Sequence, residues 1–111
     1  MGKFVIGDVV AVPFPFSDLS SNKLRPAIVL AEADYGDVIL CQITSTASIG
    51  KKTVALDDSD FKEGDLPLKS YARTDKLFTA EDTIIVKRRG KLNSQKFNSI
   101  INLVKENFTE L

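Results

Sequence analysis

Hydrophobic positions along the chain fall into short runs that are separated by polar, turn-forming segments. Most runs are rich in β-branched or aromatic residues and are bounded by Gly, Pro, Asn, Asp or Ser, which is typical of β-strands. The predicted strands span residues 8–14, 26–33, 38–44, 52–56, 70–78 and 83–87. The run at 26–33 is apolar without alternation, so we expect that strand to be buried on both faces.

The end of the chain has a different period. Its apolar residues recur at the spacing of one helix face. They are Phe97, Ile100, Ile101, Val104 and Phe108. We predict a helix that is capped by Asn93 or Ser94 and runs to about Phe108. Five or six short strands closed by one helix favour a mainly β fold, built as a small and strongly bent barrel.

The connecting segments carry turn signals. Residues 57–64 are acidic and turn-rich, with one helical turn expected at 59–62. Residues 79–82 resemble a helix start or a turn, with Thr79 as the cap. Gly90 is expected to break the strand before it, because glycine weakens the interior of a strand.

The length of 111 residues, 43% of them hydrophobic, predicts a single domain, residues 1–111, with a packed core. The single cysteine, Cys41, excludes an internal disulfide and fits a reducing cytosol. Its setting, VILCQI, indicates a small buried hydrophobe. The chain has no run of ~18 apolar residues and reaches its first strand too early for a signal peptide. We therefore expect a cytoplasmic protein that does not contact a membrane.

The charges cancel, with 15 Lys and Arg against 15 Asp and Glu. This balance argues against a domain whose whole surface is basic and binds nucleic acid. It is compatible with a local basic patch. The chain has no histidine, which excludes Ser-His-Asp triads, imidazole metal sites and histidine general bases. With one cysteine in addition, a structural zinc site is excluded. No metal or cofactor is expected.

A long polar segment separates the first two predicted strands and ends at Arg25-Pro26. Loops held out by rigid strands often carry binding residues. Arginine binds phosphate through a planar fork of charge-assisted hydrogen bonds. We therefore expect a binding site around Arg25. The alternative interpretation is that Arg25 is simply the solvated end of a loop.

The sequence resembles the PemK/MazF family of toxin–antitoxin endoribonucleases. The resemblance rests on five motifs that follow one another in order along most of the chain. They are GDVVAVPFPF at 7–16, RPAIVL at 25–30, QITS at 42–45, SYARTDKLF at 70–78 and GKL at 90–92. The family implies an SH3-like or CcdB-like barrel with a C-terminal helix, a homodimer, and metal-independent cleavage of single-stranded RNA at short sequences. It also implies inhibition by a cognate antitoxin protein.

The resemblance places the family's catalytic arginine on Arg25 and its catalytic hydroxyl on Thr44, with Ser45 as the neighbouring alternative. Arg73 and Asp75 match an Arg and an Asp that matter for cleavage in the PemK branch. For an attack by the RNA's own 2′-hydroxyl, Arg25 would stabilise the phosphate and Thr44 would bond a non-bridging oxygen. A histidine used by some relatives has no counterpart here, and Asp75 is the best candidate for the base.

The residues around these positions are expected to contact the substrate. They are Phe16, Ser17, Lys23, Ser45 and Lys51. Phe16 could stack on a base or pack at a dimer interface, whereas Phe14 is expected in the core. The basic run at 87–91 is either a solvated strand edge or an RNA contact.

Simpler interpretations exist for the other candidates. Thr44 could bond its own backbone at the end of a strand. Arg73 and Asp75 could form an exposed ion pair of little consequence. At the level of the whole protein, the same barrel occurs in toxins that bind DNA gyrase without catalysis. Those toxins typically end in Trp-containing tails, and this chain has no Trp. An inactive RNA-binding relative is the second alternative.

Overall fold

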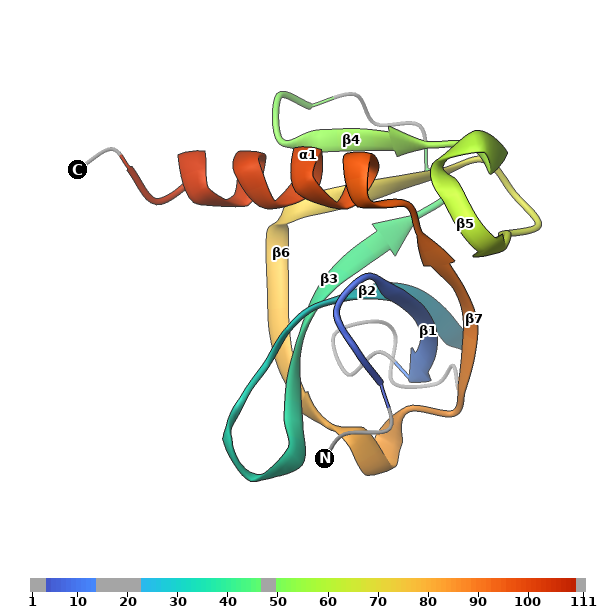
Figure 1. Ribbon diagram of the computed structural model, residues 1–111, viewed down its shortest axis with the longest axis vertical. Helices are drawn as coiled ribbons and strands as arrows, with labels where there is room; N and C mark the ends of the chain where they lie inside the picture. Colours follow the sequence, from blue (N-terminus) through green and yellow to red (C-terminus); the bar gives the residue numbers. More distant parts are fainter. Residues whose placement is uncertain (1–3, 14–22, 47–49, 110–111) are drawn as a thin grey trace.

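The computed structural model describes residues 4–13, 23–46 and 50–109 (Figure 1). In this part of the chain, seven strands and one α-helix are joined by turns and short 3-10 helices. The strands are β1 (Asp8–Pro13), β2 (Leu24–Glu32), β3 (Asp37–Thr44), β4 (Thr53–Leu56), β5 (Phe61–Gly64), β6 (Ser70–Glu81) and β7 (Lys87–Leu92). The helices are η1 (Asp34–Gly36), η2 (Asp58–Asp60), η3 (Asp82–Ile84) and α1 (Ser94–Glu106).

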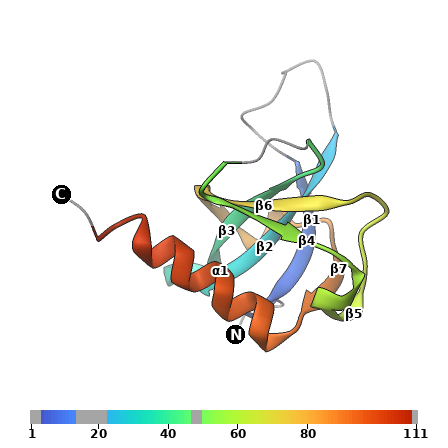
Figure 2. The same cartoon turned by 90° about the horizontal axis from the view of Figure 1, so that it is seen from above.

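The strands form one antiparallel sheet in the order β4-β6-β3-β2-β1-β7-β5. Figures 1 and 2 show that this sheet curls into a half-barrel and that α1 lies along one side of it. The predicted mainly β fold with one C-terminal helix is confirmed. Short antiparallel neighbours suit this shape, because the right-handed twist of each strand accumulates across the sheet.

The middle of β2 is buried on both faces, as the apolar run at 26–33 predicted. In β2, Ile28 and Val29 are both fully buried but belong to different hydrophobic clusters. Ile28 packs in the cluster that includes Ile100 of α1. Val29 packs in a second cluster with residues of β1 and β3 and with Ile85. Since side chains alternate between the two faces of a strand, each face of the curled sheet has its own core.

Cys41 lies in the first of these clusters with no exposed surface. Burial raises the pKa of its thiol to about 12, with a smaller contribution from the nearby Asp75 carboxylate. A thiol with this pKa is almost entirely protonated at neutral pH, so it does not act as a nucleophile. The prediction of a buried structural cysteine is confirmed.

The predicted helix is also confirmed, with Asn93 as its cap. The Asn93 side chain accepts a hydrogen bond from the Lys96 backbone N–H at 2.8 Å. This bond satisfies one of the amide groups that have no partner within the first turn of a helix. The helix ends at Glu106, so Phe108 lies beyond it rather than on its apolar face.

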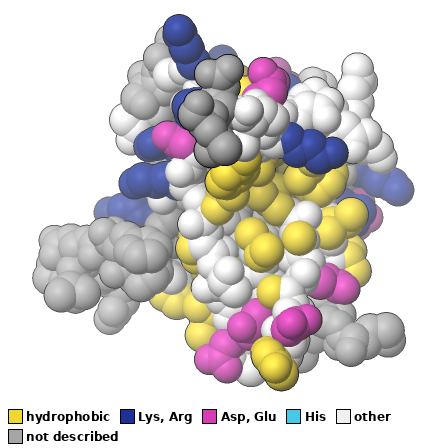
Figure 3. Space-filling model, turned by 90° about the vertical axis from the view of Figure 1, so that its left-hand side faces the viewer, with side chains coloured by type: hydrophobic (Ala, Val, Ile, Leu, Met, Phe, Trp, Pro, Cys, Tyr) yellow, Lys and Arg dark blue, Asp and Glu magenta, His cyan; other side chains and the backbone are white. Residues whose placement is uncertain are grey.

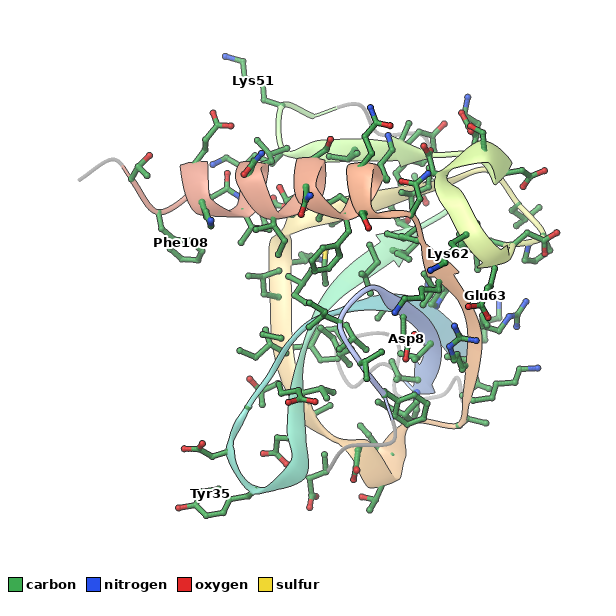
Figure 4. The ribbon with its side chains drawn as sticks, in the orientation of Figure 1. Asp8, Tyr35, Lys51, Lys62, Glu63 and Phe108 are labelled. Atoms are coloured by element: carbon green, nitrogen blue, oxygen red, sulfur yellow. The ribbon has the colours of Figure 1, made fainter. Side chains whose placement is uncertain are left out.

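A buried carboxylate joins the first strand to the last. Asp8 is only 3% exposed, and it accepts hydrogen bonds from the Val5 backbone N–H at 2.9 Å and from Arg88 Nε at 3.0 Å. Arg88 also donates a hydrogen bond to Glu63 at 3.3 Å. Glu63 lies on the neighbouring β5, and it is labelled with Asp8 in Figure 4. The bond to Asp8 raises the pKa of the Arg88 guanidinium. Asp8, in the first motif, therefore has a structural role that links β1 to β7 and, through Arg88, to β5.

The prediction for residues 57–64 was wrong in one respect. The helical turn falls at Asp58–Asp60, earlier than expected, and Phe61–Gly64 forms the edge strand β5. Three of the four β5 residues are exposed, so the segment lacks the apolar alternation that would reveal a strand. Its pairing with β7, far along the chain, stabilises it instead.

The boundary between β6 and β7 was also predicted wrongly. The strand that begins at Ser70 continues to Glu81, so Thr79 pairs within the sheet and caps no helix. The last strand is Lys87–Leu92 instead of 83–87, and Gly90 lies inside it. A Cβ atom on Gly90 would lie 2.5 Å from the Glu63 carbonyl oxygen. Glycine therefore allows two backbones to approach closely here rather than ending the strand.

Candidate functional site

A hollow of about 340 Å³ lies where β2 begins and β3 ends, and we call it the Arg25 pocket. Its polar lining includes Lys23, Arg25, Thr44, Ser45, Ser70 and Arg89. Ala27 pairs with Gln42 in the antiparallel β2–β3 ladder. Because the strands run in opposite directions, the residues just before Ala27 meet the residues just after Gln42. The hairpin register thus brings Arg25 and Thr44 into one pocket.

The guanidinium of Arg25 is not fully bonded. Its Nε atom is buried, and it is the one buried side-chain nitrogen or oxygen without a hydrogen-bond partner among the residues that the structure describes. Buried polar groups are nearly always bonded, so such an atom calls for an explanation. An oxyanion in the pocket would supply the missing acceptor and would also match the charge of the guanidinium.

The hydroxyl of Thr44 is oriented by its own loop. Thr44 Oγ1 accepts a hydrogen bond from the Thr46 backbone N–H at 3.1 Å. This is the local bond that the simpler interpretation of Thr44 expected. It uses only an acceptor position, so the hydroxyl proton is still available for donation to a ligand. The local bond is therefore compatible with a ligand contact, and it would hold the Thr44 hydroxyl in place for that contact.

The structure adds two features to the Arg25 pocket. Arg89, within the basic run at 87–91, contributes a second arginine, and Leu66–Leu68 form an apolar wall. The basic run offered a signal for Arg89. The segment before β6 offered none, because only the curling of the sheet brings it to the first hairpin. No Asp or Glu is among the described residues that line this pocket.

Arg73, Asp75 and Lys51 lie together in a different hollow of about 320 Å³, beside Lys52 and Thr53. The candidate residues are thus divided between two hollows. Arg73 and Asp75 form a two-pronged ion pair, with Nε to Oδ1 at 2.9 Å and the second nitrogen to Oδ2 at 3.1 Å. The hydrogen bonds from Arg73 lower the pKa of the Asp75 carboxyl, and the same pairing raises the pKa of Arg73. At neutral pH Asp75 is therefore ionised but a weak proton acceptor.

The remaining candidates, Phe16 and Ser17, lie outside the described residues, as does Phe14. Within the described part, no three His, Cys, Asp or Glu side chains gather as a metal site. No helix in that part is long and apolar enough to cross a membrane.

Comparisons with known structures agree on the fold. An endoribonuclease from a mycobacterial species, solved with its cognate antitoxin, is 18% identical, with a TM-score of 0.72 over 92% of this chain and 91% of its own. MazF from Deinococcus radiodurans is 18% identical, with a TM-score of 0.73 over 95% and 96%. The Mycobacterium tuberculosis toxin MazF-mt6 is 16% identical, with a TM-score of 0.71 over 91% and 95%. At sequence identities of 16–18%, this structural similarity establishes the fold alone.

The sequence itself carries the family assignment. No curated protein sequence matches this chain. However, the family model described as PemK-like, MazF-like toxin of type II toxin–antitoxin systems matches residues 6–108, which is nearly the whole chain. The protein therefore belongs to the PemK-like, MazF-like toxins of type II toxin–antitoxin systems.

Proposed function

We propose that this protein is a metal-independent endoribonuclease that cleaves single-stranded RNA, mRNA in particular, in the Arg25 pocket. One observation carries the proposal: a partly buried arginine with an unpartnered Nε lies beside a threonine hydroxyl whose proton is available. Together these groups offer fixed donors to a phosphate that gains charge during the reaction. Family membership supports RNA as the source of that phosphate.

In this mechanism the 2′-oxygen of the RNA attacks the adjacent phosphorus, and the bond from phosphorus to the 5′-oxygen breaks. The products are a 2′,3′-cyclic phosphate and a 5′-hydroxyl. Arg25 stabilises the crowded phosphate and donates a proton to the leaving oxygen. Thr44 bonds a non-bridging oxygen, with Ser45 beside it. Lys23 and Arg89 line the same pocket and contact flanking phosphates.

Removal of the 2′-hydroxyl proton requires a base, and the described lining of the Arg25 pocket holds no carboxylate. We assign this role to Asp75, which lies in the second hollow with Lys51. Its pairing with Arg73 makes it a weak base in the free protein. An RNA phosphate that binds Arg73 would compete for the guanidinium, and the pKa of Asp75 would then rise toward its usual range.

The proposed cellular setting follows from the family. Similar solved structures include MazE–MazF complexes and an endoribonuclease with its cognate antitoxin. We propose that a cognate antitoxin protein also binds and inhibits this chain, and that cleavage occurs in the cytoplasm, where mRNA is translated. Phe16 and Ser17 are proposed as substrate contacts on the segment between β1 and β2.

The function is tested by incubating pure protein with a defined RNA of mixed sequence and mapping the cut ends. We expect cuts at one recurring short sequence, with the same rate in excess EDTA, because no described group of acidic side chains is suited to a metal. Activity that disappears in EDTA and returns with Mg²⁺ would indicate a metal-assisted reaction instead. If no RNA is cut, a non-catalytic binding toxin is the better description.

We also propose that the protein is a two-fold homodimer. Hydrophobic side chains gather on the face shown in Figure 3, and Phe108, just beyond α1, is 71% exposed (Figure 4). An isologous contact would cover this face on both copies.

Light scattering should show twice the monomer mass for the wild type and for Val86→Asp, an exposed apolar position next to β7. Phe108→Asp should shift the mass toward the monomer. A wild-type monomer at micromolar concentration with full activity would contradict the proposal.

A further inference from the structure

The strand that carries Arg73 and Asp75 departs from regular pairing at this point. Cys41 of β3 pairs with Leu77 of β6, but Ile43 pairs with Ala72, so β6 has extra residues over this stretch. Such a bulge re-aims side chains and removes backbone groups from the ladder. Buried backbone groups need other partners, and Thr74, in the middle of the bulge, is only 1% exposed.

Three residues from other parts of the chain, Lys52, Asn107 and Cys41, supply partners to this stretch. The Thr74 backbone N–H and Oγ1 both donate to the Lys52 carbonyl, at 3.0 Å and 2.6 Å. Asn107 Nδ2 donates to the Thr74 carbonyl at 3.1 Å, and Lys52 Nζ donates to Asn107 Oδ1 at 2.9 Å. The Cys41 thiol donates to the Arg73 carbonyl at 3.2 Å. We call the closed ring of Lys52, Thr74 and Asn107 the Thr74 network.

The Thr74 network joins places that are distant in sequence. Lys52 directly precedes β4, Thr74 belongs to β6, and Asn107 caps the C-terminal end of α1. Figures 1 and 2 show α1 lying along β4 and β6. The residues on each side of Thr74 are Arg73 and Asp75, whose ion pair lines the second hollow. Thr74 is buried whereas Arg73 is half-buried and Asp75 is exposed, so holding Thr74 inward leaves both neighbours facing outward.

We infer that the Thr74 network positions the Arg73–Asp75 pair for RNA cleavage, which makes Thr74 and Asn107 positioning residues. The inference rests on the proposed ribonuclease function. The Arg73 and Asp75 side chains are 28% and 37% accessible. Their two hydrogen bonds join them to each other and do not anchor the pair to the rest of the molecule. Its location is fixed by the bulge beneath it. Small displacements of catalytic groups are costly, about 10²-fold in rate for ~1 Å.

Two substitutions at Thr74 separate hydrogen bonding from packing. Thr74→Val keeps the shape but loses the hydroxyl bond to Lys52, whereas Thr74→Ser keeps the hydroxyl but loses a buried methyl group. We expect Thr74→Val to lower kcat by about ten-fold or more with KM nearly unchanged, and Thr74→Ser to retain most of the activity. The reverse order, with Val active and Ser impaired, would show that Thr74 serves only packing and would overturn the inference.

Asn107→Ala tests the helix end, with Asn102→Ala, an exposed amide on the same helix, as the matched control. The readout is the NMR signal of the Arg73 Nε–H, which donates to Asp75. In Asn107→Ala this signal should shift and broaden and kcat should fall, whereas Asn102→Ala should match the wild type. An unchanged Arg73 signal in Asn107→Ala would overturn the inference. This readout needs no activity, so an inactive wild type would refute the ribonuclease and still leave the positioning role tested.

Discussion

Arg25→Ala is expected to reduce RNA cleavage by at least about 10²–10³-fold, the loss seen when one donor to a developing oxyanion is removed. The folded state should be almost unaffected, within about 1 kcal/mol of the wild type. Arg25 Nε is buried without a described partner, so its removal breaks no bond at that atom and relieves an unsatisfied donor. Arg25→Lys should restore only part of the activity, because an ammonium lacks the planar fork.

Two measurements check this result: the initial rate of cleavage of a short fluorescent RNA, and thermal unfolding of each variant. Lys62→Ala, which removes an exposed cation from β5, serves as the control and should cleave at the wild-type rate. An Arg25→Ala protein that cleaves normally would remove Arg25 from the mechanism. Equal losses in both variants would indicate that only general positive charge matters.

An RNA with a single deoxyribose on the 5′ side of the scissile phosphate is expected to bind this protein and resist cleavage completely. It keeps every base and every phosphate, so Arg25, Thr44 and Arg89 retain their ligands. It lacks the 2′-oxygen that the proposed mechanism uses as the nucleophile. Binding should weaken by the loss of one hydrogen bond, about 1 kcal/mol or roughly five-fold. The matched all-RNA strand should yield a 2′,3′-cyclic phosphate and a 5′-hydroxyl.

Mass spectrometry of the product ends, together with a fluorescence binding titration, distinguishes the possible outcomes. A cleaved deoxy substrate would mean that water or a protein side chain attacks the phosphorus. The roles proposed for Arg25, Thr44 and Asp75 would then be wrong, even though the pocket would still bind RNA. A strand that binds but is not cleaved in either form would favour an inactive relative.

The parts of the fold that depend on local pattern were predictable. The buried run in β2, the Asn93 cap and the placement of Cys41 all follow from residues close together in the sequence. The meeting of Arg25 and Thr44 was also accessible, because they flank a single hairpin whose strands pair antiparallel. The family resemblance added the roles proposed for them but not their geometry.

The parts that depend on distant pairing were not predictable. β5 exists because it pairs with β7, and Gly90 is needed because the Glu63 backbone passes so close to it. Arg73 and Asp75 lie in the bulge of β6 and line a hollow separate from the Arg25 pocket. Within that bulge, Thr74 accepts a hydrogen bond from Asn107, which is 33 residues away in the sequence. No local pattern in residues 70–78 signals such a partner.

The buried thiol has a further consequence for experiments on this protein. Cys41 is the only cysteine in the chain, it is fully buried in β3, and its sulfur bonds a carbonyl of the β6 bulge. A thiol-modifying reagent can reach this sulfur only when the core that α1 covers opens. The rate of modification at low denaturant therefore measures how often the centre of the sheet opens, without the introduction of any label. The same burial shields the Cys41 thiol from oxidants, so oxidation at this position should also require opening of the core.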